Sequence, residues 1–192
     1  MPRIGIILGS NRPKRNSEQV AKWVYERASR RDDATFELID LRDFPLPYFD
    51  EPFPPALGRY QNEHTKQWAN VIASFDGFVI VTPEYNHSIP GVLKNAIDYV
   101  YAEWANKAVG FVSYGVAGGA RAVEHLRTIA GNLHLADVSK QVTLHLMTEF
   151  EDMTVFKPGD YNLEALDSML GQVVAWSTAL TPLRATPAVR AS

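Results

Sequence analysis

Short apolar runs alternate with longer amphipathic segments along most of the 192-residue chain. Five runs have the length and composition of buried strands: Ile4 to Leu8, Phe36 to Ile39, Phe78 to Val81, Ala108 to Val112 and Val142 to Leu146. The intervening segments carry apolar residues at helical spacing and predict five helices: Ser17 to Arg30, Asn62 to Phe75, Val92 to Tyr101, Arg121 to Leu133 and Leu163 to Ala179. Strands that alternate with helices predict an α/β fold, with a parallel sheet covered by helices on both faces.

Residues 1–180 have the size of one domain, and the tail 181–192, with two prolines and small residues, is expected to be flexible. The segment 43–58 contains five prolines and therefore predicts an extended surface loop. Its aromatic and apolar residues are expected to pack, either on their own domain or on a partner subunit.

Net charge and amino-acid composition exclude several classes of partner and of catalytic chemistry. The net charge of -3 argues against nucleic acid or an anionic membrane as the main partner, because both require a concentrated positive surface. The chain has no cysteine, which excludes disulfides, thiolate catalysis and iron–sulfur clusters, so redox chemistry requires a bound cofactor.

The five histidines show no metal-ligand spacing, and we expect no metal site. The apolar run near the amino terminus is too short for a signal peptide, so we expect a cytoplasmic location.

The densest group of polar residues, Thr82 to Gly91, directly follows the third predicted strand. Open α/β sheets bind ligands at the carboxyl ends of their strands. Pro83 and Pro90 restrict their own backbone angles and those of the residues before them, so the polar groups between them are held in place. Such pre-organisation suits a flat ligand with polar edges, although an ordinary loop with two prolines has the same composition.

A second polar loop, Gly9 to Ser17, lies between the first strand and the first helix. Backbone N–H groups at the helix start, the hydroxyls of Ser10 and Ser17, and the guanidinium of Arg12 or Arg15 together suit a terminal phosphate. The loop has neither the Gly-Lys-Ser/Thr of a Walker loop nor the dinucleotide fingerprint Gly-x-Gly-x-x-Gly. It therefore favours a mononucleotide, the alternative being an ordinary helix cap flanked by solvated cations.

A third loop, Ser113 to Arg121, follows the fourth strand and contains three glycines. These glycines let the backbone approach a ligand closely, or they simply make a tight turn. In a doubly wound sheet of strand order 2-1-3-4-5, the loops after strands one, three and four surround the switch point. One ligand can then touch all three loops.

Three motifs carry a family resemblance: Gly9-Ser10-x-Arg12, the block from Pro83-Glu84-Tyr85-Asn86 to Ala96-Ile97-Asp98, and Ser113-Tyr114-Gly115 with Gly118-Gly119-x-Arg121. Together they resemble the NADPH-dependent FMN reductase family, over most of the chain. The resemblance implies a three-layer flavodoxin-like fold, FMN as cofactor, NADPH or NADH as electron donor, and a homodimer or homotetramer. The family includes quinone, azo-dye and chromate reductases, so the implied electron acceptor is a small electrophilic molecule.

At matching positions the resemblance implies two sets of cofactor-binding residues. The phosphate set is Ser10, Arg12, Arg15, Asn16, Ser17 and Gln19. The isoalloxazine set is Pro83, Glu84, Tyr85 and Asn86, with Ser113, Gly115 and Gly118 closing the other edge of the ring. No catalytic side chain is assigned, because flavin N5 carries the chemistry. Glu84 is expected to pair with a basic residue, either of its own chain or across a subunit interface.

The predicted function is an FMN-dependent NAD(P)H oxidoreductase. Hydride passes from the nicotinamide to flavin N5, and electrons then pass to a quinone, azo or similar acceptor by a ping-pong mechanism. Two alternatives stay open, a flavodoxin-like electron carrier and a non-catalytic FMN-binding module. Charge weighs against the carrier, because such proteins are usually more acidic, which steers them to basic partners.

Four tryptophans complete the predictions. Trp23, Trp68 and Trp176 lie at helical spacing among apolar residues and are predicted to be in the core. Trp104 follows the helix after the loop at residues 82–91, where core packing and a dimer contact are equally compatible with its surroundings.

Overall fold

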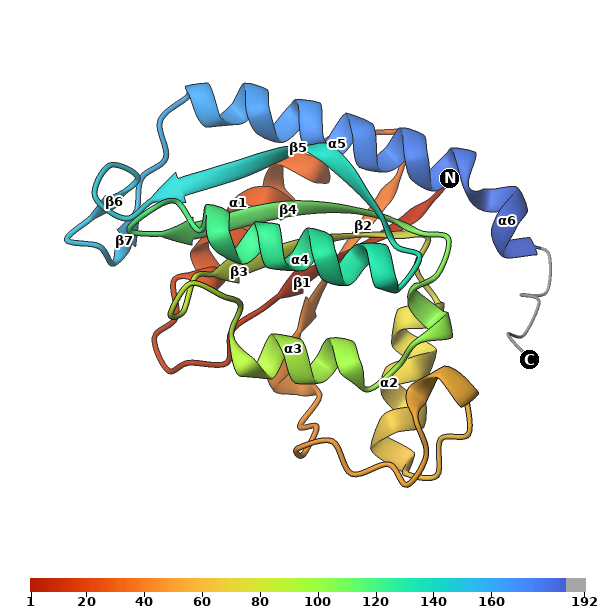
Figure 1. Ribbon diagram of the computed structural model, residues 1–192. Coiled ribbons are helices and arrows are strands. Elements are labelled where there is room, and N and C mark those ends of the chain that lie inside the picture. The colour runs from red at the N-terminus through yellow and green to blue at the C-terminus, as the bar shows by residue number, and fades with distance from the viewer. Residues whose placement is uncertain (186–192) are drawn as a thin grey trace.

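The chain folds around a five-stranded parallel sheet whose strand order is β2-β1-β3-β4-β5 (Figure 1). The computed structural model describes residues 1–185. The strands are β1 (Arg3–Leu8), β2 (Thr35–Asp40), β3 (Gly77–Pro83), β4 (Ala108–Gly115) and β5 (Ala136–His145). Every neighbouring pair in this sheet is parallel. The predicted doubly wound α/β fold with order 2-1-3-4-5 is therefore confirmed.

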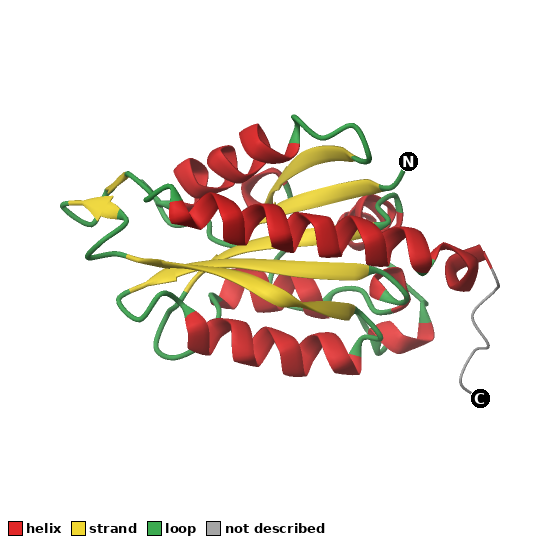
Figure 2. Cartoon of the chain, turned by 90° about the horizontal axis from the view of Figure 1, so that it is seen from above, coloured by secondary structure: helices red, strands yellow, loops and turns green. Residues whose placement is uncertain are grey.

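Helices cover both faces of the sheet, as the view from above shows (Figure 2). They are α1 (Ser17–Ala28), α2 (Glu63–Ala73), α3 (Gly91–Asp98), α4 (Ala120–Asn132), α5 (Tyr161–Ala179) and α6 (Thr181–Ala185). Short 3-10 helices connect some of these elements: η1 (Leu41–Asp43), η2 (Pro55–Leu57) and η3 (Ala102–Trp104). Residues of α1 and α5 pack on one face of the sheet, and residues of α2, α3 and α4 pack on the other. The five predicted helices are all present.

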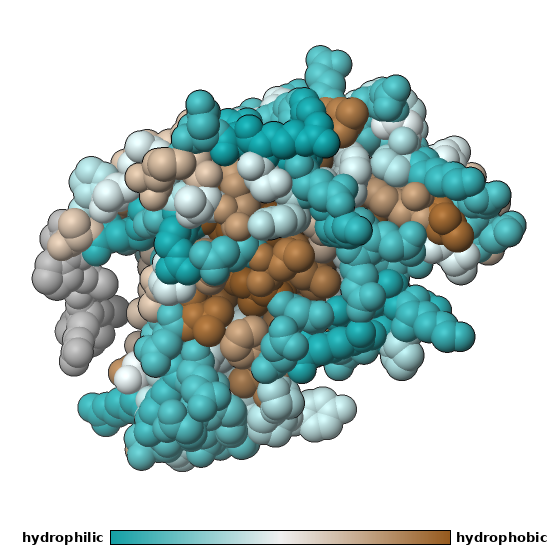
Figure 3. Space-filling model, turned by 180° about the vertical axis from the view of Figure 1, so that it is seen from behind, coloured by the Kyte–Doolittle hydropathy of each residue, from teal (hydrophilic) through white to brown (hydrophobic). Residues whose placement is uncertain are grey.

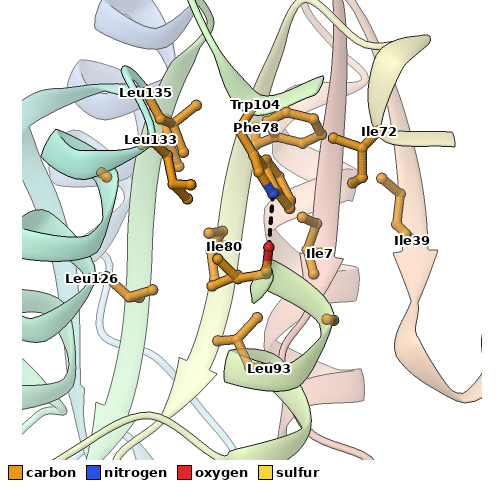
Figure 4. Packing of buried hydrophobic residues seen from close by; sticks show 14 of the residues in the cluster. Ile7, Ile39, Ile72, Phe78, Ile80, Leu93, Trp104, Leu126, Leu133 and Leu135 are labelled. Atoms are coloured by element: carbon orange, nitrogen blue, oxygen red, sulfur yellow. Dashed lines mark hydrogen bonds between the residues drawn. The ribbon is translucent and has the colours of Figure 1, made fainter. Parts of the chain in front are cut away.

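The central strands are buried on both faces because alternate side chains enter different cores. In β3, Phe78 and Ile80 join the core beneath α2, α3 and α4, whereas Val79 and Val81 join the core beneath α1 and α5. Figure 4 shows Phe78 beside Trp104 in the first of these cores, with ring centroids 5.0 Å apart. Fully burying one such side chain stabilises the fold by about 1.5–3 kcal/mol.

Strand β5 begins at Ala136 rather than at the predicted Val142. Its first half contains Asp137, Ser139 and Lys140, so it does not form an apolar run. As an edge strand that pairs only with β4, it tolerates side chains that face water. A prediction based on apolar runs therefore finds only the second half of the strand.

The proline-rich segment 43–58 is a loop apart from short 3-10 turns near its two ends. The buried carboxylate of Glu51 fixes it to the start of α2 by accepting a hydrogen bond from the backbone N–H of Asn62, at 2.9 Å. The ring of Phe44 packs on the core of its own chain, whereas Tyr48 is 95% exposed. The loop is thus held against its own domain and still presents an aromatic side chain to solvent.

The tryptophans divide between core and surface. Trp68 and Trp104 are buried, and the indole N–H of Trp104 donates to the carbonyl of Ile97 at 3.1 Å (Figure 4). Core packing therefore accounts for Trp104 without a dimer contact. The prediction for Trp176 is wrong, because its side chain is 47% exposed. Helix α5 is apolar around much of its circumference, so helical spacing alone does not identify its buried side.

The carboxyl-terminal part differs from the prediction in two places. Between β5 and α5 the chain forms a small antiparallel hairpin, β6 (Phe150–Glu151) and β7 (Val155–Phe156). Residues 181–185 form α6, where Arg184 makes an ion pair with Asp76 at 2.8 Å. The predicted flexible tail thus starts with a helical turn, and residues 186–192 lie outside the described residues. The single domain over residues 1–180 stays a prediction.

Apolar side chains also reach the surface. Figure 3 shows them gathered in the middle of the back face, with hydrophilic residues around them. Large apolar patches often mark interaction sites. The predicted homodimer or homotetramer stays a prediction. Among residues 1–185, no helix combines the length and the apolar character needed to cross a membrane.

Candidate active site

The loops after β1 and β3 and the end of β4 surround a cavity of about 410 Å³. The register of the sheet places them together, because Leu8 pairs with Val81, and Pro83 pairs with Tyr114. The lining residues are Arg12, Lys14, Arg15, Asn16, Pro83, Glu84, Tyr85, Tyr114, Gly115, Leu146, Asp152, Met153 and Thr154. Predicted site residues in this lining are Arg12, Arg15, Asn16, Pro83, Glu84, Tyr85 and Gly115.

Ser10 connects the first two loops. Its buried hydroxyl lies 3.2 Å from the hydroxyl of Tyr85 and accepts a hydrogen bond from the backbone N–H of Arg12 at 3.3 Å. Ser10 therefore fixes the aromatic ring that lines the cavity, although it is not itself among the lining residues.

Arg15 lines the cavity, but acidic groups of its own chain hold its guanidinium. Nη1 lies 2.8 Å from Oδ1 of Asp40, Nη2 makes a second bond to the same carboxylate, and Nε lies 3.1 Å from Glu18. Burial raises the pKa of Asp40, but the bonds from Arg15 and from the backbone N–H of Arg42 outweigh it and hold the pKa below its usual value. This network organises the first loop and leaves Arg15 little capacity for an external anion.

Two other cations line the same end of the cavity. The side chains of Arg12 and Lys14 make no hydrogen bond or ion pair with any residue in the range 1–185. Next to them, at the start of α1, the hydroxyl of Ser17 is fully buried and has no hydrogen-bond partner of ordinary geometry in that range. The two free cations, together with the helix start, suit an anionic group.

The second loop contains a tight turn from Tyr85 to Ser88, whose backbones exchange hydrogen bonds of 2.9 and 3.0 Å. The two central residues, Asn86 and His87, have φ angles of 49° and 70°. Positive φ at both central positions is the geometry of a type I′ turn, which asparagine tolerates better than most residues. Asn86 lies at the exposed tip of this turn and does not line the cavity.

Glu84 pairs with Arg121 of the same chain rather than across a subunit interface. Arg121 Nε lies 2.6 Å from Glu84 Oε1, and Arg121 Nη1 lies 2.7 Å from Nε2 of His87. Since Arg121 lies in the first turn of α4, this contact ties the second loop to the third.

The third loop is shaped by two predicted residues that do not line the cavity. The hydroxyl of Ser113 donates to the carbonyl of Gly118 at 2.8 Å, and Gly118 has a φ of 67°. Gly115 does line the cavity, and a Cβ built there would lie 3.3 Å from the Cβ of Glu84. A side chain at position 115 would therefore crowd the cavity wall.

The hairpin β6–β7 supplies a wall that the sequence reasoning missed. Asp152, Met153 and Thr154 at its tip line the cavity. Two of the predicted phosphate ligands contact this hairpin: Asn16 Nδ2 lies 2.9 Å from the carbonyl oxygen of Met153, and Gln19 Nε2 lies 2.8 Å from that of Thr154. Three further lining residues, Lys14, Tyr114 and Leu146, were also missed. Leu146 directly follows β5, so the position of that strand was the available signal.

The cavity fits FMN by its chemistry. The free cations Arg12 and Lys14 line it just before the start of α1, where a phosphate is stabilised. Pro83, Tyr85 and Gly115 also line the cavity, and they suit a flat ring. Within residues 1–185, no group of three or more His, Cys, Asp or Glu side chains is placed to hold a metal ion.

Comparisons with known proteins agree with this chemistry. The family model of the NADPH-dependent FMN reductases matches residues 2–149. An NAD(P)H-dependent FMN reductase of Schizosaccharomyces pombe is 45% identical over 136 residues, which cover 70% of this chain and 68% of the relative. A 2-hydroxy-1,4-benzoquinone reductase of Burkholderia sp is 32% identical over 142 residues, which cover 69% of this chain and 72% of the relative.

A solved structure shows the same fold. The flavoenzyme NAD(P)H:(acceptor) oxidoreductase FerB of Paracoccus denitrificans superposes with a TM-score of 0.69 at 21% identity, covering 93% of this chain and 98% of that one. At that identity the likeness concerns the fold alone. The family match and the relatives carry the assignment: the chain belongs to the NADPH-dependent FMN reductase family, and it is an oxidoreductase that uses FMN and a reduced nicotinamide nucleotide.

Proposed function

We propose that this protein oxidises NAD(P)H and reduces a quinone, with FMN bound in the cavity of about 410 Å³. One observation carries the proposal: Arg12 and Lys14 face a cavity at the carboxyl edge of the sheet with no acidic partner among residues 1–185. Two free cations in such a cavity are suited to neutralise the phosphate of the cofactor.

The phosphate end of the site is assigned to Arg12 and Lys14, which line the cavity, while Arg15 holds the loop through Asp40. Ser17 is buried behind this lining at the start of α1. Ser10 acts through Tyr85, whose hydroxyl it contacts at 3.2 Å. These roles follow from which side chains are free and which are already paired.

The ring end is assigned to Pro83, Tyr85 and Gly115, which line the cavity. Glu84, Ser113 and Gly118 shape the two loops around it, and Asn86 lies at the tip of the turn. Residues 1–185 offer no side chain that we assign as a proton donor. Burial raises the pKa of Tyr114 well above its usual range, so this tyrosine stays protonated.

When bound, FMN would supply the redox chemistry, taking hydride from the nicotinamide and giving electrons to the acceptor. A ping-pong mechanism is the expected kinetic pattern. The chain's own part is to hold the cofactor, to exclude water and to position donor and acceptor in turn.

A quinone is the proposed acceptor because relatives above 30% identity are named quinone reductases, including one of Pseudomonas putida at 33% over 126 residues. Azo compounds are a second proposed acceptor class, with weaker support, because the neighbours named azoreductases share only the fold, at a TM-score of 0.54.

Anaerobic stopped-flow absorbance tests the proposal. The FMN-loaded protein is mixed with NADPH and, separately, with NADH, and we expect the flavin band to bleach within seconds with at least one donor. Steady-state rates with a benzoquinone should then give parallel double-reciprocal lines. FMN uptake without bleaching by either donor would favour the electron carrier or the binding module, and no FMN uptake would contradict the site assignment.

A further inference from the structure

The hairpin β6–β7 forms one wall of the cavity and lies outside the region that matches the family model, which ends at residue 149. Figure 1 shows it projecting beyond the carboxyl end of β5. Asp152 and Met153 at its tip have φ angles of 48° and 55°, and the N–H of Thr154 donates to the carbonyl of Glu151 at 3.0 Å. This tight turn directs the tip into the cavity lining.

The hairpin is too short to hold its own position. It has only two paired positions, Phe150 with Phe156 and Glu151 with Val155, and an isolated ribbon of this size is not stable in water. Its placement against the cavity therefore depends on contacts with the rest of the chain.

One anchor lies at the base of the hairpin. The carboxylate of Glu149 is 2% exposed and accepts hydrogen bonds from the backbone N–H of Gly159 at 2.9 Å and from Asn162 Nδ2 at 2.8 Å. The hydroxyl of Tyr161 donates to the same carboxylate. These donors attach the base to the start of α5 but leave the tip free.

The tip is held by α1. Gln19 uses both ends of its amide, donating from Nε2 to the carbonyl of Thr154 at 2.8 Å and accepting at Oε1 from the N–H of Phe156 at 3.0 Å. One turn further along α1, the ring of Trp23 packs edge-on against Phe156, with centroids 5.5 Å apart. Asn16 adds its bond to Met153 and itself lines the cavity.

We infer that Gln19 is a positioning residue that binds no ligand itself and holds the hairpin 150–156 as the wall retaining the phosphate end of FMN in the cavity. The inference rests on the proposed function. Gln19 is absent from the cavity lining, and both ends of its amide are already used on the hairpin. Asn16, which contacts the hairpin tip and the cavity together, lies beside the free cations at the same end.

The test is the rate at which FMN leaves the protein, followed by the recovery of free flavin fluorescence after dilution. We expect Gln19→Ala to release FMN roughly tenfold faster than wild type, because two hydrogen bonds that hold the wall are lost. Gln19→Glu keeps the size of the side chain but loses the N–H donor, and it should release FMN faster as well. Lys22→Ala is the matched control, since Lys22 is exposed on the same helix and touches neither the hairpin nor the cavity.

Hydrogen exchange separates a positioning role from a general loss of stability. In Gln19→Ala, amides of residues 150–156 should exchange faster, while the urea midpoint of the cofactor-free protein stays close to that of wild type. If the variant fails to fold, hydrogen exchange is measured on wild type with and without FMN. We expect bound FMN to slow exchange at residues 150–156. Equal exchange with and without FMN would overturn the inference.

The outcomes keep this inference apart from the proposed function. If wild type takes up no FMN, the proposed function fails. If wild type retains FMN and Gln19→Ala releases it at the wild-type rate with unchanged exchange in the hairpin, only the role of Gln19 fails.

Discussion

The carboxylate of Glu84 and the guanidinium of Arg121 form an ion pair within one chain, in which Nε of Arg121 lies 2.6 Å from Oε1 of Glu84. The side chain of Glu84 is only 7% exposed, whereas that of Arg121 is 45% exposed. Because Arg121 also contacts His87, a single side chain fixes both the base and the tip of the turn beside the cavity.

Replacing Arg121 with alanine should lower the free energy of unfolding by about 1–3 kcal/mol, because a nearly buried carboxylate loses its cation. Urea unfolding measures the change. The control is Lys94→Ala, which removes an ion pair to Asp98 whose two side chains are about half exposed, and which should change stability by no more than about 1 kcal/mol. Equal effects of the two substitutions would contradict the importance assigned to the Glu84 pair.

Arg12→Ala should weaken FMN binding by about 1–3 kcal/mol, because a charge-assisted bond to the phosphate is lost. A fluorescence titration gives the dissociation constant. Raising the salt concentration should weaken binding to wild type more than binding to the variant, since one of the screened charges is already gone.

Arg30→Ala serves as the control for Arg12. It removes the same charge just beyond the end of α1, outside the cavity lining, and should leave FMN affinity unchanged. Unchanged affinity in Arg12→Ala as well would argue against the phosphate assignment.

The fold could be predicted because central strands and their helices differ sharply in pattern. Phe78 and Val81 belong to a continuous apolar run, since β3 is buried on both faces. The first half of β5 escaped prediction because an edge strand mixes polar and apolar residues. The exposure of Trp176 was not predicted for a related reason, because α5 has no sharply polar side.

The site was predicted less completely, because sequence position does not reveal which side chains are already paired. Arg15 and Arg12 are equivalent by spacing, and only the fold brings Asp40 to Arg15. The family resemblance implied a phosphate role for Gln19, and the fold brings Thr154 to its amide from 135 residues away. Long-range partners of this kind leave no local signature.

Gly119→Ala should destabilise the protein by about 1–3 kcal/mol, because position 119 requires a backbone conformation that side chains disfavour. Its φ is 78°, and a Cβ there would lie 2.7 Å from the Cβ of Ser113. Gly171→Ala is the control: that glycine lies inside α5 with no atom within 4 Å of an added Cβ, and alanine there should stabilise by about 0.5–1 kcal/mol. Thermal unfolding compares the two, and a neutral Gly119→Ala would show that the third loop adjusts freely.

The pair between Asp40 and Arg15 should make stability depend on pH in the acid range. Burial raises the pKa of Asp40, but the bonds from Arg15 and from the backbone of Arg42 outweigh it, so the folded-state pKa lies below the unfolded value of about 3.9. The stabilisation is therefore complete above about pH 4 and is lost as the pH falls through the folded-state pKa.

Comparing the free energy of unfolding of Asp40→Asn with that of wild type at several pH values tests this dependence. At pH 7 the variant should be less stable than wild type by about 1–3 kcal/mol, because the buried guanidinium of Arg15 loses its charged partner. Below about pH 4 the difference should shrink, since wild type then loses the same charge by protonation. Arg15→Ala removes the cation of the pair. Its difference from wild type in the free energy of unfolding should also shrink below about pH 4. Urea unfolding measures the difference in stability between Asp40→Asn and wild type. If this difference stays constant from pH 7 to pH 3, protonation of Asp40 does not contribute to the acid dependence of stability.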